Sequence, residues 1–397
     1  MSEKDSKNND EQYSLPLLEE ELKVEREDAE SSNDVHPWDP EKIRITTKHF
    51  SLREVVDQIS DGDIDLSPDF QRDYVWNERQ KTRLVESVLL GIPLPAFYFN
   101  QETDGSYQIV DGVQRLSTIA AFMKNEHSLR STNLEYLKDY DGLKFKDLAT
   151  LELRRFRSTQ IVVHVIEPTT PADIKYDIFS RVNTLGSPLK AQEIRHAMST
   201  SRSRNYLTKF VENTHFDNAT DFNFWKVTEN GKSIRNSGRM TDREIALRFC
   251  AFKASSLEEY RQFSSLDSFL VNFTERLDGK TKNSITDTEM EHLLSSFESA
   301  MDSAHQILGN LAFRRIEDGK QRRGPINRAI FESQSIALSR YSTKELMKRS
   351  SEVKDILLGL FQNPEYTKSV TVGTGAPNSV KTRLDLPKAA LAELFND

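Results

Sequence analysis

The sequence has a single cysteine, little glycine and no long hydrophobic run. Because Cys250 is the one cysteine among 397 residues, it can form neither an internal disulfide nor a multi-cysteine zinc site. With 15 glycines and 13 prolines, the chain has few of the turn residues that sheet-rich sandwiches need, which favours helices. No apolar stretch approaches the roughly 18 residues of a bilayer span, and the first residues lack a signal-peptide core. We therefore expect a cytoplasmic protein with no membrane segment.

Charge is distributed unevenly along the chain, whose net charge is -8. Residues 1–40 hold four Lys/Arg against thirteen Asp/Glu, which leaves 50 against 49 in residues 41–397. An acidic segment with few aromatic residues cannot bury enough apolar surface to offset its ordering entropy. We therefore predict that residues 1–40 are a mostly disordered tail and that the function lies after them.

Helix signals appear soon after the acidic tail. A capping box at Ser51 and Glu54 predicts an amphipathic helix that ends at Gly62. Asn77 is placed to cap a second helix.

Three strands are expected next. Residues 96–99 and 107–110 flank an Asp-Gly turn and predict a β-hairpin. Residues 160–166 are rich in β-branched side chains and predict a third strand. Apolar periodicity and Pro171 predict helices at 113–123 and 171–182.

Helices dominate from residue 196 onward, and a Gly/Thr/Ser-rich loop is expected at 367–379. Three further capping boxes precede apolar-periodic runs: Thr241 with Glu244, Thr286 with Glu289, and Ser342 with Glu345. We therefore predict an α+β fold class, with a tail at 1–40, a small α+β domain at 41–195 and a mainly helical domain at 196–397.

The most informative segment is IVDGVQRLST, residues 109–118. It runs from a predicted strand through Gly112 into a predicted helix, whose first N–H groups and positive end can bind a phosphate. Arg115 can add bidentate hydrogen bonds to phosphate oxygens, and Gln114 can orient a phosphate or a water.

The same segment also fits ordinary turn chemistry, because Asp111 can simply cap the helix. Alternatively, Asp111 can hold a metal-bound water, and Ser117 or Thr118 can donate one further hydrogen bond. Residue spacing alone leaves both interpretations open.

A second segment, residues 70–76, sets Gln71 and Arg72 among three aromatic residues. Aromatic faces stack on bases or on guanidinium planes, which suits a nucleotide site. Phe70 and Trp76 can equally be core anchors beneath an exposed arginine.

Three separated segments occur in the order and spacing of one family: FQRDYVW at 70–76, IVDGVQRLST at 109–118 and FSRVNTLGSPLKAQEIR at 179–195. They resemble the N-terminal domain of GmrSD-type restriction enzymes, and the stretches 239–252 and 327–340 resemble longer members. The resemblance implies an α+β core similar to ParB and sulfiredoxin folds, in which the glycine–arginine turn binds a nucleotide. It also implies nucleotide hydrolysis and the recognition or restriction of modified or foreign DNA.

The resemblance further implies a nucleoside triphosphate site that works with a divalent metal, expected to be Mg²⁺. Catalytic roles would fall to Asp111, Gln114 and Arg115, and nucleotide contacts to Gly112, Gln71, Arg72, Asn183 and Gly186. The family usually has Gln where this chain has Val113, so one possible polar contact is missing.

Many members of the family carry an HNH-type nuclease domain, whose metal-binding and general-base histidines commonly stand in an H-x-x-P context. No such motif occurs here, and no metal-ligand set is predicted among the eight scattered histidines. We therefore expect the chain to act with a separately encoded nuclease.

Two clusters of basic residues could form a nucleic-acid surface, because clustered cations neutralise phosphates and release counterions. Solvated helix ends would look the same in sequence. The candidate contacts are Arg195, Arg202 and Arg204 in the first cluster, and Arg314, Arg315, Arg322 and Arg323 in the second. The acidic tail could cover such a surface by mimicking DNA.

The leading hypothesis is a nucleotide-binding, NTP-hydrolysing component of a DNA restriction or anti-phage defence system. A non-catalytic DNA- or partner-binding module is the main alternative, and a ParB-like DNA nickase is a third. The nucleotide, the DNA modification and the oligomeric state stay open.

Overall fold

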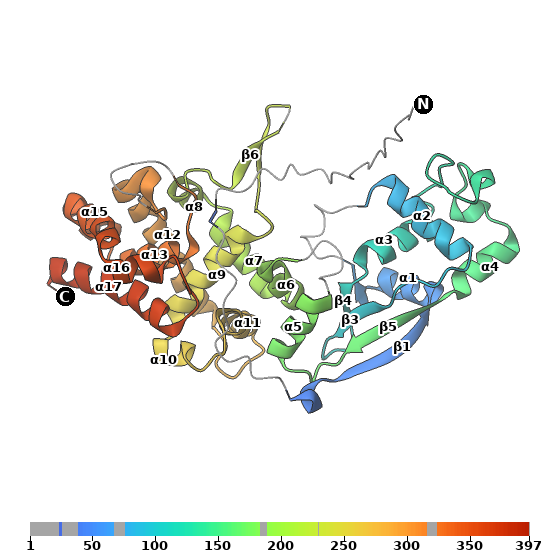
Figure 1. Cartoon of the computed structure of the whole chain (residues 1–397), viewed down its shortest axis with the longest axis horizontal. Coiled ribbons are helices and arrows are strands. Elements are labelled where there is room, and N and C mark those ends of the chain that lie inside the picture. The colour runs from blue at the N-terminus through green and yellow to red at the C-terminus, as the bar shows by residue number, and fades with distance from the viewer. Residues whose placement is uncertain are drawn as a thin grey trace, which may run out of the picture.

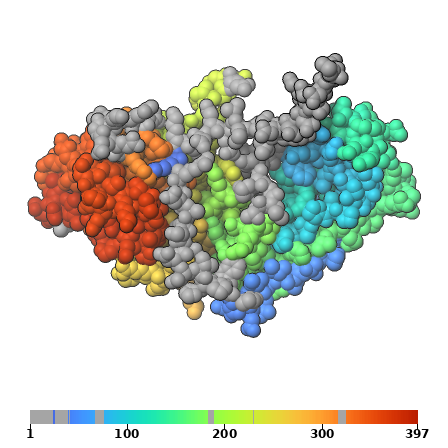
Figure 2. All heavy atoms as spheres, viewed as in Figure 1, coloured from blue at the N-terminus to red at the C-terminus, as the bar shows by residue number. Residues whose placement is uncertain are grey.

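The computed structural model describes residues 24–25, 39–66, 76–182, 189–228, 230–315 and 324–396. A mixed α/β part lies at one end of the molecule and a helical part at the other (Figure 1). In the space-filling view, the green segment that joins them lies at the middle of the molecule (Figure 2). No helix in the described ranges is long and apolar enough to cross a membrane.

The mixed part is built on a sheet. Among the described residues, five strands pair in the order β1-β5-β3-β4-β2. β1 (Ile45–Ser51) runs antiparallel to β5 (Gln160–Ile166), which is parallel to β3 (Phe97–Gln101). β4 (Tyr107–Asp111) is antiparallel to β3 and parallel to β2 (Ile64–Asp65).

The two faces of this sheet meet different helices, because alternate strand residues face opposite sides. Phe97 and Phe99 of β3 are fully buried in the core beneath the first four helices. Tyr98 packs on the other side, with residues of α5 and α6. The helices are α1 (Leu52–Asp61), α2 (Glu78–Leu89), α3 (Val113–Met123), α4 (Thr150–Ser158), α5 (Ala172–Val182) and α6 (Ala191–Met198).

The helical part forms a second, larger core around α9, which is buried over most of its length. Its elements are α7 (Ser201–Val211), α8 (Thr214–Ala219), the hairpin of β6 (Trp225–Val227) and β7 (Ser233–Arg235), α9 (Thr241–Ala254), α10 (Leu257–Tyr260), α11 (Leu266–Leu277), α12 (Asp287–Leu308), α13 (Arg328–Leu338), α14 (Thr343–Lys348), α15 (Ser350–Gly359), α16 (Pro364–Ser369) and α17 (Pro377–Phe395). Short 3₁₀ helices lie at Pro40–Lys42, Lys138–Tyr140, Phe145–Asp147, Gly309–Leu311 and Leu360–Gln362. The predicted fold class, an α+β part followed by a mainly helical part, is confirmed.

Most local predictions are confirmed in detail. The Ser51 hydroxyl accepts a hydrogen bond from the backbone N–H of Glu54 at 3.2 Å, and α1 ends at Gly62. The N-cap of α2 at Asn77, the hairpin of β3 and β4 and the strand at Gln160–Ile166 also form as predicted. The sequence of β1 does not predict a strand, because its first residues are exposed and show no apolar alternation. Its pairing with β5 is what holds it in the sheet.

The capping box predicted at Thr241 and Glu244 is wrong. α9 begins after Met240, which has a φ of 63° and provides no side-chain cap. The Thr241 hydroxyl donates instead to the Gly238 carbonyl at 2.7 Å, and the Glu244 carboxylate accepts from Arg248 at 2.7 Å. In a capping box, the Glu244 carboxylate would accept from a backbone N–H at the start of the helix. Here it binds the buried Arg248 guanidinium instead, because charge-assisted hydrogen bonds are stronger.

Two predicted segment limits also differ from the structure. The loop expected at 367–379 is shorter, because α16 extends into its start and α17 into its end. The expected domain boundary between residues 195 and 196 falls inside α6. Ile194 and Ala197 of this helix share a small core with Val271 of α11, so α6 belongs to the contact between the two parts.

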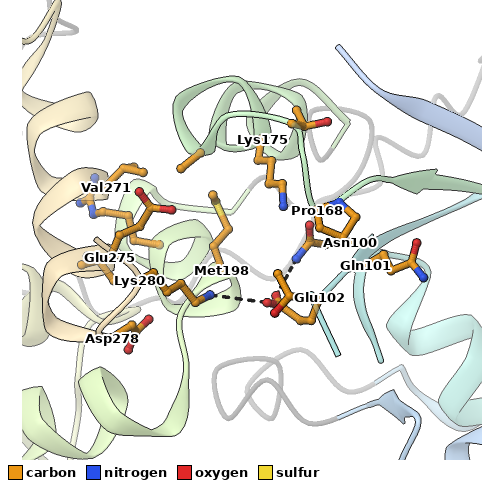
Figure 3. Close-up of a pocket in the computed structure, with 15 residues that line it drawn as sticks. Asn100, Gln101, Glu102, Pro168, Lys175, Met198, Val271, Glu275, Asp278 and Lys280 are labelled. Carbon is orange, nitrogen blue, oxygen red and sulfur yellow. Dashed lines mark hydrogen bonds and ion pairs between the residues drawn. The ribbon is translucent and has the colours of Figure 1, made fainter. Parts of the chain in front are cut away.

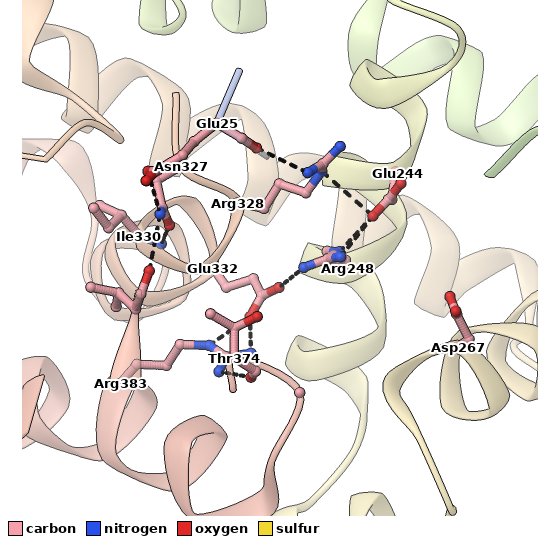
Figure 4. Close-up of polar contacts among 12 residues, drawn as sticks. Glu25, Glu244, Arg248, Asp267, Asn327, Arg328, Ile330, Glu332, Thr374 and Arg383 are labelled. Atoms are coloured by element: carbon pink, nitrogen blue, oxygen red, sulfur yellow. Dashed lines mark hydrogen bonds and ion pairs between the residues drawn. The ribbon is translucent and has the colours of Figure 1, made fainter. Parts of the chain in front are cut away.

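A buried ion-pair network joins three helices of the helical part (Figure 4). Glu332 of α13 is fully buried; its Oε1 accepts from Arg248 of α9 at 3.0 Å and its Oε2 accepts from Arg383 of α17 at 2.8 Å. Arg248 also binds Glu244 within its own helix at 2.7 Å. Burial alone would raise the pKa of Glu244, but the surrounding guanidinium groups outweigh it and lower that pKa to about 2.

We expect Glu332→Gln to lower the free energy of unfolding by about 3 kcal/mol or more, because it removes the carboxylate that pairs with the buried Arg383 and leaves Arg248 with Glu244 alone. Thermal unfolding followed by circular dichroism measures this loss. The matched control is Glu352→Gln, which removes the partner of Arg349 in an exposed ion pair and should leave the midpoint unchanged. Equal shifts in the two variants would contradict a structural role for the network.

Candidate functional site

The predicted turn forms where β4 meets α3. Asp111 ends β4, Gly112 adopts a φ of 103°, and Val113 begins α3. A Cβ atom on residue 112 would lie 2.2 Å from Cδ1 of Phe97. Glycine is therefore required here twice, by the left-handed backbone and by the aromatic ring beside it.

Arg115 fixes this turn to the start of β3. Its Nη1 donates to the Pro95 carbonyl at 2.5 Å, and its Nη2 donates to Asp111 Oδ2 at 2.7 Å and to the Ala96 carbonyl at 3.2 Å. The guanidinium carbon also lies 4.2 Å from the centre of the Phe97 ring, and the side chain is only 12% exposed. Burial lowers the pKa of Arg115, and the Asp111 carboxylate opposes that effect.

Gln114 connects the turn to the end of the aromatic segment. Its Oε1 accepts a hydrogen bond from the backbone N–H of Trp76 at 3.3 Å. Thr118 is buried, and its hydroxyl donates to the Gln114 carbonyl at 2.7 Å, inside its own helix. Ser117 is partly exposed. The structure thus brings Asp111, Gly112, Gln114 and Arg115 together, whereas Gln71, Arg72, Asn183 and Gly186 lie outside the described residues.

The predicted nucleic-acid clusters contain buried arginines. Arg195 and Arg314 are 1% and 2% exposed. Arg195 pairs with Asp267 at 2.5 Å, and Arg314 donates to the Thr220 carbonyl at 3.3 Å. Their interpretation as surface contacts is corrected accordingly, because both guanidinium groups are used inside the fold.

The other arginines of these clusters have different environments. Arg202 binds Asp287 at 2.7 Å, and Arg204 donates to the His196 carbonyl at 3.1 Å. The Arg315 side chain is 38% exposed and pairs with Glu25. Arg322 and Arg323 lie outside the described residues.

A cavity of about 360 Å³ lies where the end of β3 meets α5, α6 and α11 (Figure 3). Lys175 and Glu275 line it from opposite helices, and Lys280 lies 3.5 Å from Glu102 across the junction. Burial lowers the pKa of Lys175 and raises that of Glu275. Within the described residues, the buried Oδ1 of Asn100 has no hydrogen-bond partner, so the cavity suits a small polar molecule that carries a donor.

Sequence reasoning missed this cavity because its lining comes from segments that are distant along the chain. No local spacing marks Lys175, Glu275 and Lys280 as neighbours. Within the part of the chain that the structure describes, no group of three or more His, Cys, Asp or Glu side chains is arranged to hold a metal ion.

We expect Gly112→Ala to destabilise the domain more than Gly105→Ala does. Both glycines have positive φ, 103° and 94°, so both variants lose about 1 kcal/mol or more from the backbone. A Cβ on residue 105 meets nothing within 4 Å, whereas one on residue 112 collides with Phe97. The difference between the two unfolding midpoints measures the collision, and identical midpoints would contradict this packing.

Comparison with known proteins adds one match. Residues 52–199 match the family model described as the GmrSD restriction endonuclease, N-terminal domain. The matched segment begins at the first residue of α1, ends just after α6 and contains the turn at 111–115. No curated protein and no solved structure matches the chain. This match over residues 52–199 points to a component of a restriction or defence system.

Proposed function

We propose that residues 111–115 bind a nucleoside triphosphate and that the domain hydrolyses it with Mg²⁺, in a DNA restriction or anti-phage defence system. In this proposal the chain senses DNA and acts with a separately encoded nuclease. The observation that carries it is the Asp111–Arg115 ion pair at the start of α3, within the matched domain.

The start of α3 has the properties of a phosphate site. Gly112 occupies its N-cap position and offers no side-chain cap to the first-turn N–H groups. The positive end of the helix dipole attracts an anion. Arg115 adds a guanidinium, paired with Asp111, beside this helix end, and Gln114 accepts from the backbone N–H of Trp76, whose side chain packs against the core of the mixed part.

Asp111 is the residue that would hold Mg²⁺. Its side chain is 38% exposed, and the ion pair described for it uses Oδ2 alone. Proteins commonly bind Mg²⁺ through one or two carboxylates together with the phosphates of the substrate, and a single exposed carboxylate fits that pattern. Bound Mg²⁺ neutralises charge on the phosphates.

Arg115 has two roles in this proposal. Its bonds to Pro95 and Ala96 position the turn, and its charge stabilises the transferred phosphoryl group. Because Arg115 also supports the fold, its removal would not separate catalysis from stability. Asp111 is the better test residue, since asparagine can still accept a hydrogen bond from Arg115.

We expect Asp111→Asn to reduce phosphate release from nucleoside triphosphates by about 100-fold or more, because the metal loses its anionic ligand. The unfolding midpoint should change little. Asp57→Asn is the matched control, since Asp57 forms an exposed i,i+4 ion pair with Arg53 in the same domain. Turnover that is the same in both variants would remove Asp111 from the mechanism.

A thermal-shift screen with nucleoside triphosphates identifies the nucleotide. A ligand that binds only the folded chain raises the unfolding midpoint. At a concentration of 100 times its Kd, it adds about 2.7 kcal/mol to the free energy of unfolding. We expect a shift that requires Mg²⁺ and that Asp111→Asn weakens. A DNA mobility shift without phosphate release would favour a non-catalytic binding module, and metal-dependent nicking of supercoiled plasmid would favour a nickase.

A further inference from the structure

A carboxylate from the acidic N-terminal segment lies among donors of the helical part (Figure 4). Glu25 Oε2 accepts from Asn327 Nδ2 at 2.8 Å, and its Oε1 pairs with Nη2 of Arg315. The Glu25 carbonyl accepts from Arg328 at 3.2 Å, and its N–H donates to the Ile326 carbonyl at 2.7 Å. We call the donors Arg315, Asn327 and Arg328 the Arg315 site.

Two residues of the Arg315 site have contacts other than those with Glu25. Asn327 is 3% exposed and caps α13 by accepting from the backbone N–H of Ile330 at 2.9 Å. Its Nδ2 also donates to the Val370 carbonyl at 3.0 Å. Arg328 is 14% exposed and lies 3.5 Å from Glu244, a member of the buried network. Asn327 and Arg328 would therefore stay in place if Glu25 left.

Arg315 has more donors than Glu25 uses. Its Nε is buried and has no hydrogen-bond partner among the residues that the structure describes. A guanidinium offers Nε and Nη as a planar fork that matches two oxygens of one phosphate. A backbone phosphate presents two non-bridging oxygens, as a carboxylate does, so it can take the place of the Glu25 carboxylate at these donors.

The surrounding sequence favours a polyanion over a small phosphate. Between residues 315 and 328 the chain carries five arginines and lysines against two acidic residues, apart from the buried Arg314. A nucleic-acid backbone can contact several such cations and release several counterions, whereas an isolated phosphate contacts few.

We propose that the Arg315 site binds a backbone phosphate of DNA and that Glu25 occupies it as an internal competitor when DNA is absent. The proposal rests on the DNA-sensing part of the proposed function and does not depend on nucleotide hydrolysis. DNA binding then exchanges one carboxylate for one phosphate at the same donors. The acidic segment thereby sets a threshold for DNA binding.

Fluorescence anisotropy of the full chain with a labelled DNA duplex, over a series of salt concentrations, tests this exchange. We expect Glu25→Gln to tighten binding about two- to fivefold at low salt, as expected for the loss of one partly exposed ion pair. Arg315→Gln should weaken binding and reduce the slope of log K against log [salt] by about 1. In the Arg315→Gln background, Glu25→Gln should have little further effect.

The control is Glu41→Gln, which removes one negative charge at an exposed position near the same segment. Equal tightening by Glu25→Gln and Glu41→Gln would show general repulsion and overturn the proposal. The proposal is also overturned if Glu25→Gln tightens DNA binding by the same factor in the Arg315→Gln background as in the wild-type chain. If inorganic phosphate displaces the labelled DNA when both are at the same concentration, the site binds small anions instead, and the proposal is overturned. If no variant binds DNA while phosphate release persists, this inference fails and the hydrolase proposal stands.

Discussion

The ion pair between Arg115 and Asp111 is the contact on which the candidate site depends. One guanidinium joins the end of β4, the start of α3 and the two carbonyls that precede β3, and it lies against the ring that excludes any side chain at residue 112. Because a single guanidinium that is only 12% exposed makes all of these contacts, the turn is preorganised before any ligand arrives. A phosphate would then meet a fixed charge and a fixed helix end, which is the arrangement that makes electrostatic stabilisation effective.

Buried charge organises the helical part as well. Glu332 and Glu244 hold arginines from α9, α13 and α17 inside the larger core, where each unpaired charge would be costly. The same chemistry explains why basic clusters in the sequence do not correspond to basic surfaces. Arg195 and Arg314 are among the largest fully buried side chains, whereas Arg315, one residue further on, is partly exposed and faces Glu25.

Features with a local cause could be predicted from the sequence. The caps at Ser51 and Asn77, the hairpin around its Asp-Gly turn and the strand–glycine–helix at Gly112 all depend on residues within a few positions of one another. The capping box at Thr241 fails for the opposite reason: Glu244 meets arginines that the chain brings from elsewhere. The cavity beside Asn100 gives no signal because four elements contribute to its lining.

The sequence by itself determined the helix caps at Ser51 and Asn77, the hairpin of β3 and β4 and the glycine turn before α3, because short-range sterics and hydrogen bonds settle them. Tertiary structure alone decided which charges are buried, which partners they have and where the two parts enclose a cavity. Those outcomes depend on contacts between residues up to 303 positions apart, as between Glu25 and Arg328. Coulomb interactions and desolvation act through space, so no spacing along the chain reveals them.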